Sequence, residues 1–260
     1  MDGGPSSRRT AAAGVKTTLL HDGMGASPWV HGFNVPVHPE DSADLFLRDT
    51  LASGRGLSDP ALARALCQDA AEVFDQMRAL GLSFNREKDG GYQALRPLGA
   101  SWPRVVSIGN ETGAEILTRL KETLRDSVTE LPGTRALKLL KDGGRVCGAL
   151  AYDAAGKRWL TLRAKAVVLA CGGYCGIYPF STNKRDSGGD GVAMAYEAGA
   201  ELCDMEFIQF EPSAAVWPRE LAGTSVITTL LFEGAVLRNR DGERFMLRYG
   251  SDGDRVSKDV

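Results

Sequence analysis

The sequence predicts an α/β protein whose sheet carries a small antiparallel layer. Two observations support this prediction. Short apolar segments alternate with helical patterns along most of the 260 residues, which is typical of strands that alternate with helices. Between residues 135 and 163, three extended segments instead follow one another directly, separated by glycine-containing turns, which is typical of a β-meander.

The first half of the chain provides one strand and two helices. Val15–Leu20 is predicted as a strand, and Ser42–Leu51 as a helix because its apolar residues recur at helical spacing. A longer helix is expected after Ser58, a good N-cap, with Pro60 in its first turn and Gly81 at its end. Its expected buried face consists of Leu62, Leu66, Val73, Phe74, Met77 and Leu80.

A third helix and the meander follow. The helix starts at Thr112-Gly113, and its buried face is expected to hold Ile116, Leu117, Leu120 and Leu124. The meander strands are expected at Arg135–Lys141, Arg145–Tyr152 and Lys157–Arg163. Glycine-containing turns separate them, so each strand can pair with the next.

The stretch from Ala166 to Ala200 is the candidate ligand site. Ala166–Ala170 is a short apolar run, typical of a strand buried on both faces, and Gly172 and Gly173 follow it closely. A second glycine cluster, Ser187–Gly191, opens the next helix. A strand, a glycine turn and a glycine-rich helix start can wrap a phosphate-bearing cofactor. A tight connection without any ligand explains the same spacing, which leaves both interpretations open.

The last part of the chain is expected to be largely extended. Strands are predicted at Asp204–Phe210, Val226–Leu231 and Ala235–Asn239, and a turn at Asp241-Gly242. No internal repeat and no low-complexity segment is present in the sequence.

Composition argues against several classes of function. The formal net charge is −2 and no long basic run is present, so nothing supports nucleic-acid binding. No apolar run approaches the roughly 20 residues that span a bilayer. The N-terminus lacks the apolar core of a secretory signal. We therefore expect a cytoplasmic protein without a transmembrane segment.

The cysteines and histidines do not indicate a metal site. Five cysteines without a Cys-x-x-Cys pair do not predict a disulfide framework. Cys171 and Cys175 flank the glycine turn, and small buried thiols are the favoured interpretation over redox or metal use. His21, His31 and His38 lack the close helical spacing of metal ligands.

An ordered series of motifs resembles a known family. The motifs are VVLACGGY at 167–174, Thr182-Asn183, GGDGVAMAYEAGAELCDMEFIQFEP at 188–212 and NRDGERFM at 239–246. From about Ala11 onward, the sequence resembles the flavoprotein subunits of fumarate reductase and succinate dehydrogenase and their relative L-aspartate oxidase. The resemblance implies an FAD-binding, Rossmann-like doubly wound sheet with an inserted antiparallel β-meander at 1–207. It also implies the beginning of an α+β substrate-capping domain at 208–260.

The resemblance further implies which residues bind FAD. Residues along the flavin or the dinucleotide would be Gly25, Ala26, Ser27, Gly172 and Gly173, and residues hydrogen-bonded to the cofactor would be Thr182, Asn183 and Asp190. The family's ribose-binding acid falls on His21, with Asp22 as a neighbouring substitute. No histidine clearly matches the covalent attachment point of some members, so FAD is expected to be non-covalent.

Departures from the family's pattern limit what the resemblance implies. The opening strand and GxGxxG turn are missing, and the chain stops within the capping domain, so it resembles a protein truncated at both ends. The reductases' proton-relay glutamate and arginine fall on Thr228 and Leu231. Glu211 stands in place of a histidine, and Lys258 in place of the catalytic arginine. Glu211 and Lys258 are the catalytic candidates, with a surface charge as the favoured interpretation of each.

The expected function is that of an FAD-dependent oxidoreductase with hydride transfer through the flavin and an unidentified small-molecule substrate. An electron-transfer subunit is a candidate partner. The alternative is an inactive truncated fragment, or one piece of a split flavoprotein, with the same fold. A nicotinamide-dependent dehydrogenase is disfavoured because no nucleotide fingerprint with its distal acid is intact.

Overall fold

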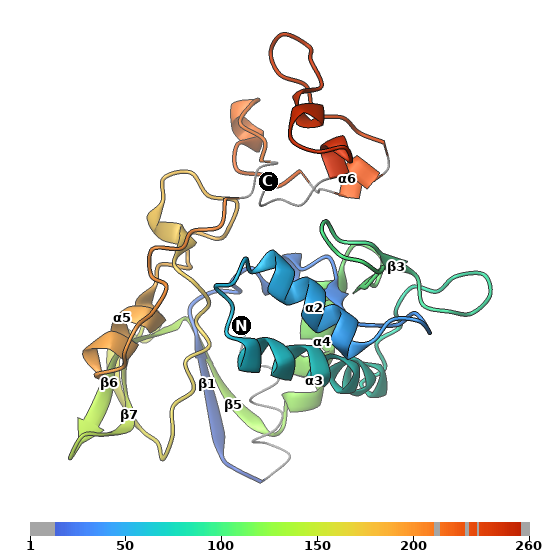
Figure 1. Ribbon diagram of the computed structural model, residues 1–260. Coiled ribbons are helices and arrows are strands. Elements are labelled where there is room, and N and C mark those ends of the chain that lie inside the picture. The colour runs from blue at the N-terminus through green and yellow to red at the C-terminus, as the bar shows by residue number, and fades with distance from the viewer. Residues whose placement is uncertain (1–13, 211–213, 227–228, 233, 256–260) are drawn as a thin grey trace. The chain divides into compact units, whose positions relative to one another are not determined.

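The computed structural model describes residues 14–210, 214–226, 229–232 and 234–255, and the chain divides into two compact units. Unit 1 comprises Met1–Val30 and Gly113–Phe210, and unit 2 comprises His31–Thr112 and Glu211–Val260. Each unit is therefore assembled from two separate stretches of sequence (Figure 1).

Unit 1 contains a parallel strand pair. β1 (Thr17–His21) and β5 (Val128–Pro132) pair in parallel along their whole length, and they run side by side in Figure 1. α4 (Thr112–Leu124) leads into β5 and buries Leu117 and Leu120, as expected from its periodicity. The strand predicted at Val15–Leu20 is confirmed with slightly shifted ends. Parallel pairing requires a long crossover connection, which is a feature of α/β folds.

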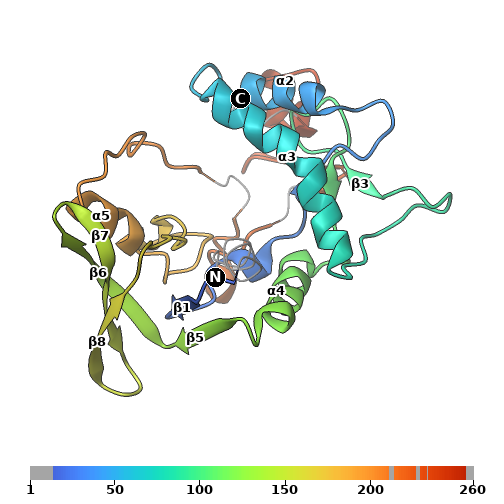
Figure 2. The same cartoon turned by 90° about the horizontal axis from the view of Figure 1, so that it is seen from below.

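The antiparallel meander is confirmed. β6 (Thr134–Asp142), β7 (Arg145–Asp153) and β8 (Arg158–Arg163) form a three-stranded sheet in that order. Gly143 and Gly144 make the first turn with φ of +54° and +84°, conformations that glycine adopts without strain. α5 (Asp190–Glu197) packs against β6, as both Figure 1 and Figure 2 show.

Two strands predicted from apolar runs are wrong. Within the part of the chain that the structure describes, Ala166–Ala170 and Asp204–Phe210 pair with no other strand. Val168 is 64% exposed, so the burial expected for Ala166–Ala170 is also missing, and Phe210 is 85% exposed. An apolar run becomes a buried strand only where another strand accepts its backbone hydrogen bonds and a further layer covers its side chains.

Two packed helices, α2 (Ala43–Ser53) and α3 (Pro60–Ala79), form part of unit 2. The N-cap of α3 is Asp59 rather than Ser58, because the Asp59 carboxylate accepts hydrogen bonds from the first turn. The buried contacts between the helices come from Phe46, Leu47, Ala63 and Cys67.

The expected buried face of α3 is only partly correct. Phe74 is buried as predicted, but Leu62 and Leu66 are 72% and 61% exposed. Small residues, Ala63 and Cys67, occupy the side that faces α2. Leucine spacing alone therefore indicated the helix but not the face that it buries.

An aromatic cluster and a small sheet complete this part of unit 2. The sheet has the order β2 (Phe33–Asn34), β4 (Val105–Val106) and β3 (Ala94–Leu95). The ring centroid of Phe74 lies 4.8 Å from that of Phe84 and 6.1 Å from that of Phe33. These edge and tilted contacts attach α3 to the sheet.

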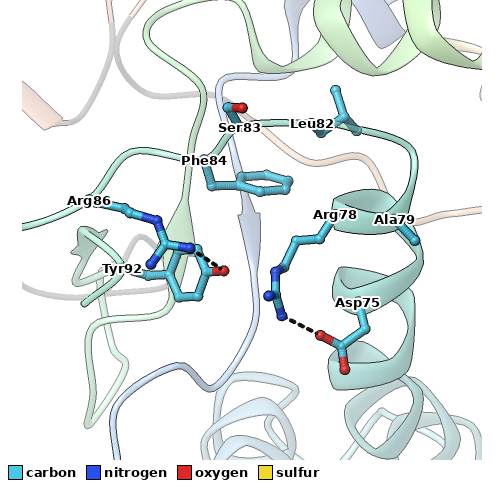
Figure 3. Close-up of a pocket in the computed structure, with 8 residues that line it drawn as sticks. All are labelled: Asp75, Arg78, Ala79, Leu82, Ser83, Phe84, Arg86 and Tyr92. Atoms are coloured by element: carbon cyan, nitrogen blue, oxygen red, sulfur yellow. Dashed lines mark hydrogen bonds and ion pairs between the residues drawn. The ribbon is translucent and has the colours of Figure 1, made fainter. Parts of the chain in front are cut away.

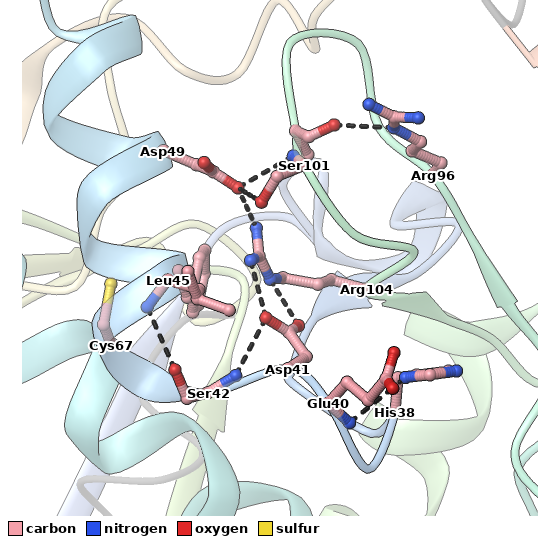
Figure 4. A network of polar contacts seen from close by, with 12 residues as sticks. His38, Glu40, Asp41, Ser42, Leu45, Asp49, Cys67, Arg96, Ser101 and Arg104 are labelled. Carbon is pink, nitrogen blue, oxygen red and sulfur yellow. Dashed lines mark hydrogen bonds and ion pairs between the residues drawn. The ribbon is translucent and has the colours of Figure 1, made fainter.

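A buried ion network also fixes unit 2 (Figure 4). Arg104, which is 1% exposed, donates two hydrogen bonds of 2.7 Å to Asp41 and one of 2.6 Å to Asp49 Oδ2. The hydroxyl of Ser101 donates to the same oxygen of Asp49 at 2.6 Å. The network therefore ties α2 to the loop that leads into β4.

The C-terminal part of unit 2 differs from the prediction. Val226–Leu231 overlaps a short helix, α6 (Thr229–Phe232), and Ala235–Asn239 is irregular. The turn at Asp241-Gly242 is confirmed, because Gly242 N donates to Asn239 O at 3.0 Å. The 3-10 helices lie at Ser27–Trp29, Cys175–Ile177, Arg219–Leu221, Phe245–Arg248 and Gly253–Arg255. Among the described residues, no helix combines the length and apolarity needed to cross a membrane.

Candidate functional site

The glycine turn in unit 1 has an accessible backbone. Gly172 has a φ of +69°, which favours glycine. A Cβ placed on Gly173 would meet no heavy atom within 4 Å, and both glycines are exposed. A flat ligand can therefore approach this backbone closely.

α5 begins directly against the glycine turn. A Cβ on Gly189 would lie 2.8 Å from Tyr174 Cβ, and one on Gly191 would lie 2.9 Å from Cys171 Cβ. Glycine is therefore required at both positions for the helix to come this close. Gly189, the N-cap of α5, has no side chain to accept hydrogen bonds from the first turn of the helix.

The loop after β1 meets the loop before α5. A Cβ on Gly23 would collide with the Asp186 carboxylate. Lys184 Nζ lies 3.8 Å from the ring centroid of Trp29, which is a cation–π contact. Two of the predicted binding segments, distant in the sequence, are thus adjacent in unit 1.

The predicted flavin-facing residues Gly25, Ala26 and Ser27 lie in a loop that α4 holds in place. Gly113 N donates to Val30 O at 2.8 Å, and a Cβ on Gly113 would collide with the Ser27 carbonyl oxygen. Gly25 has a φ of +57°, so the loop turns there. The backbone of this loop is therefore positioned by close packing against a helix.

Thr182 and Asn183 are half-buried in the loop before α5. Asn183 Oδ1 accepts a hydrogen bond from Lys184 N at 2.7 Å, and Asn183 N donates to Ser181 Oγ at 3.1 Å. The side-chain oxygen of Asn183 thus stabilises the loop itself. Its NH₂ group is the part suited to donate to a ligand.

Asp190 pairs with a residue that the sequence did not indicate. Arg135, near the start of β6, donates to Asp190 Oδ2 through Nε at 3.0 Å and through Nη2 at 2.6 Å. The hydrogen bonds and charge of Asp190 raise the pKa of Arg135 above its usual value, and the charge of Asp22 adds to this effect. An arginine near the start of a meander strand matches no motif, so only the fold reveals this pair.

The structure distinguishes the two candidates for the ribose-binding acid. His21 Nε2 lies 2.7 Å from Glu130 Oε1, so this hydrogen bond links β1 to β5. Asp22 is exposed directly after β1. Of the two residues, Asp22 is the one whose side chain is accessible to a ligand.

The catalytic candidates Glu211 and Lys258 lie outside the described residues, as does Thr228. The site that can be built from the structure is therefore a binding site in unit 1.

Unit 2 has a cavity of its own, about 650 Å³ in volume, beside the end of α3 (Figure 3). Arg86 in its wall donates to Gly90 O at 2.6 Å and to the Tyr92 hydroxyl at 2.9 Å. Arg78 donates to Asp75 at 2.8 Å. Arg86 thus stabilises the hairpin between residues 86 and 92, and Arg78 pairs with a residue of its own helix.

Comparison with known proteins identifies the family. A family model described as "FAD binding domain" matches residues 9–260. The chain belongs to this FAD-binding family. It is 36% identical over 226 residues to a subunit of the fumarate reductase (CoM/CoB) of Methanothermobacter marburgensis, covering 86% of this chain and 41% of that protein. It is 35% identical over 228 residues to L-aspartate oxidase of Agrobacterium fabrum. That match covers 86% of this chain and 43% of the oxidase.

Solved structures of other proteins have the same fold. The chain matches FrdA of E. coli quinol fumarate reductase with a TM-score of 0.88 at 26% identity, covering 96% of this chain and 43% of that one. It matches Mycobacterium smegmatis Sdh1 with a TM-score of 0.82 at 29% identity. That match covers 96% of this chain and 46% of the Sdh1 chain. The chain therefore spans less than half the length of these relatives. The predicted family, α/β fold class and FAD cofactor are confirmed.

The geometry of unit 1 fits the cofactor of this FAD-binding family. Both Gly172 and Gly173 are exposed, and the open space around Gly173 allows a planar or phosphate group to approach. The first turn of α5 has no side-chain cap at Gly189, which leaves N–H groups that suit an anion. Asn183 and Asp190 add a donor and an acceptor for the polar groups of FAD.

Proposed function

We propose that this chain supplies FAD binding to an FAD-dependent oxidoreductase that transfers hydride through the flavin to or from an unidentified small molecule. The observation that carries the proposal is the convergence of three segments in unit 1. These are the glycine turn at Gly172-Gly173, the start of α5 and the loop after β1. All predicted binding residues belong to unit 1.

Within this proposal, the residues of the chain bind and orient the cofactor. Gly172 and Gly173 permit close approach, and Gly25–Ser27 lie along the flavin. Thr182, Asn183 and Asp190 hydrogen-bond the cofactor. FAD, when bound, supplies the hydride chemistry. Binding is non-covalent, since no histidine clearly matches the attachment point of the covalent members.

We also propose a domain organisation, a partner and a cellular location for the chain. Residues 1–207 constitute the FAD-binding domain, and 208–260 begin the capping domain. An electron-transfer subunit is the proposed partner, because one matched structure is a chain of quinol fumarate reductase. A cytoplasmic location is proposed because Cys67, Cys147, Cys175 and Cys203 form no disulfide, as expected in a reducing compartment.

The activity is tested with the chain reconstituted with FAD. Reduced methyl viologen serves as an artificial electron donor, and a panel of unsaturated carboxylic acids that includes fumarate serves as acceptors. In a second arm, amino dicarboxylates that include L-aspartate are added to the oxidised flavoprotein without oxygen. We expect viologen oxidation or flavin bleaching with at least one compound. A protein that binds FAD but responds to no compound would support the alternative of an inactive piece of a flavoprotein.

A further inference from the structure

We propose that Arg135 is a positioning residue for the cofactor: it holds the Asp190 carboxylate at the start of α5 in the orientation that accepts a hydrogen bond from FAD. This inference rests on the proposed function. Arg135 belongs to the meander and lies 55 residues before Asp190 in the sequence.

The geometry of the pair leaves one carboxylate oxygen for the cofactor. Both hydrogen bonds from Arg135, through Nε at 3.0 Å and Nη2 at 2.6 Å, end on Asp190 Oδ2. The other oxygen, Oδ1, can therefore accept from a hydroxyl group. FAD carries several hydroxyl groups, and an ionised carboxylate can only accept hydrogen bonds, so the two are complementary.

The Arg135–Asp190 ion pair also lowers the electrostatic repulsion between Asp190 and the cofactor. The pyrophosphate of FAD is anionic, and an unneutralised carboxylate at the start of α5 would repel it. Arg135 compensates the charge of Asp190 and also interacts electrostatically with Asp22. The chain thereby keeps a hydrogen-bond acceptor at the binding loops without an added net negative charge.

β6 holds α5 at both ends. Arg135 contacts the first residue of the helix, and Lys141 Nζ donates to Ala198 O at 2.7 Å beyond its last turn. The side chains of Arg135 and Asp190 are 49% and 45% exposed, so their pairing contributes little to overall stability. Its main consequence is the orientation of Asp190. Lys141 provides a matched control, because it binds the same helix from the same strand at the opposite end.

The experiment measures the FAD dissociation constant by quenching of flavin fluorescence. For Arg135→Gln we expect weakening of about tenfold, and for Lys141→Gln less than about twofold. Arg135→Lys should recover part of the loss. In the Asp190→Asn background, Arg135→Gln should cause little further loss, because it acts through Asp190. Unchanged affinity for Arg135→Gln, or an equal loss for Lys141→Gln, overturns the inference.

A second measurement needs no cofactor. Amide hydrogen exchange at the N–H groups that close the first turn of α5, beginning with Ala193 N, which donates to Gly189 O at 3.0 Å, should become faster on the FAD-free chain in Arg135→Gln and stay unchanged in Lys141→Gln. Unchanged exchange in Arg135→Gln overturns the positioning role. If the wild-type chain binds no FAD, the proposed function fails, and hydrogen exchange still decides whether Arg135 orders this turn.

Discussion

Arg104→Met is expected to destabilise the protein by about 3–5 kcal/mol, because it leaves the carboxylates of Asp41 and Asp49 buried without their cation. Asp41 has a fully buried side chain and Asp49 is 14% exposed, so water cannot replace the guanidinium (Figure 4). Methionine keeps much of the side-chain volume, which restricts the change to charge and hydrogen bonding. The free energy of unfolding in urea measures the effect.

A matched variant separates this effect from the general loss of an arginine. Arg119 forms an ion pair of 3.1 Å with Glu122 on the surface of α4, with both side chains about half exposed. We expect Arg119→Met to cost less than about 0.5 kcal/mol, as is usual for such helical pairs. Equal losses in the two variants would contradict the importance of the buried network.

The same network predicts the direction of a pH effect. Burial acts to raise the pKa of Asp49, but hydrogen bonds from Ser101 and Arg104 outweigh it and hold the pKa below its usual value. Asp49 therefore contributes stability above its unfolded pKa of about 3.9, and this contribution is lost as the pH falls through the folded pKa. Acid titration of wild type should show this loss, and in Arg104→Met the pKa of Asp49 should rise.

Gly191→Ala is expected to weaken FAD binding by about tenfold, which corresponds to about 1.4 kcal/mol. The new Cβ would lie 2.9 Å from Cys171 Cβ and 3.1 Å from its Sγ, so α5 must move away from the glycine turn. Overpacking of this kind typically costs about 1–3 kcal/mol. Fluorescence titration with FAD measures the change in affinity.

Two companion variants make the Gly191 prediction specific. Cys171→Gly removes both atoms that collide with the new methyl group, so it should restore affinity in the Gly191→Ala background. Gly188→Ala, in the same glycine cluster, places a Cβ no closer than 4.0 Å to its nearest neighbour and should change affinity little. An unrescued double variant, or equal losses for Gly188 and Gly191, would show that close helix packing is not the cause.

The parts of the fold that depend on local chemistry could be predicted from the sequence. Pro60 starts α3, and Gly143 and Gly144 form the first turn of the meander, since each residue acts through its own backbone conformation. The strand predicted at Ala166–Ala170 was wrong because strand formation depends on a partner elsewhere in the chain.

The residues of the candidate site likewise divide into those that local sequence patterns indicate and those that depend on distant contacts. Glycine spacing indicated Gly172, Gly173 and the start of α5, because a close backbone approach requires glycine locally. Arg135 could not be found this way. Its role comes from an ion pair with Asp190 that forms only after the meander and α5 pack together, and no local pattern in the sequence records that contact.

The most direct test of cofactor binding is an FAD titration of the purified 260-residue chain, followed by denaturation and filtration. We expect a yellow protein that binds one FAD per chain, quenches or shifts flavin fluorescence, and releases all of its flavin into the filtrate. Colour that stays with the denatured chain would contradict non-covalent binding. A chain that remains colourless after incubation with excess FAD would contradict the central claim that unit 1 holds the cofactor.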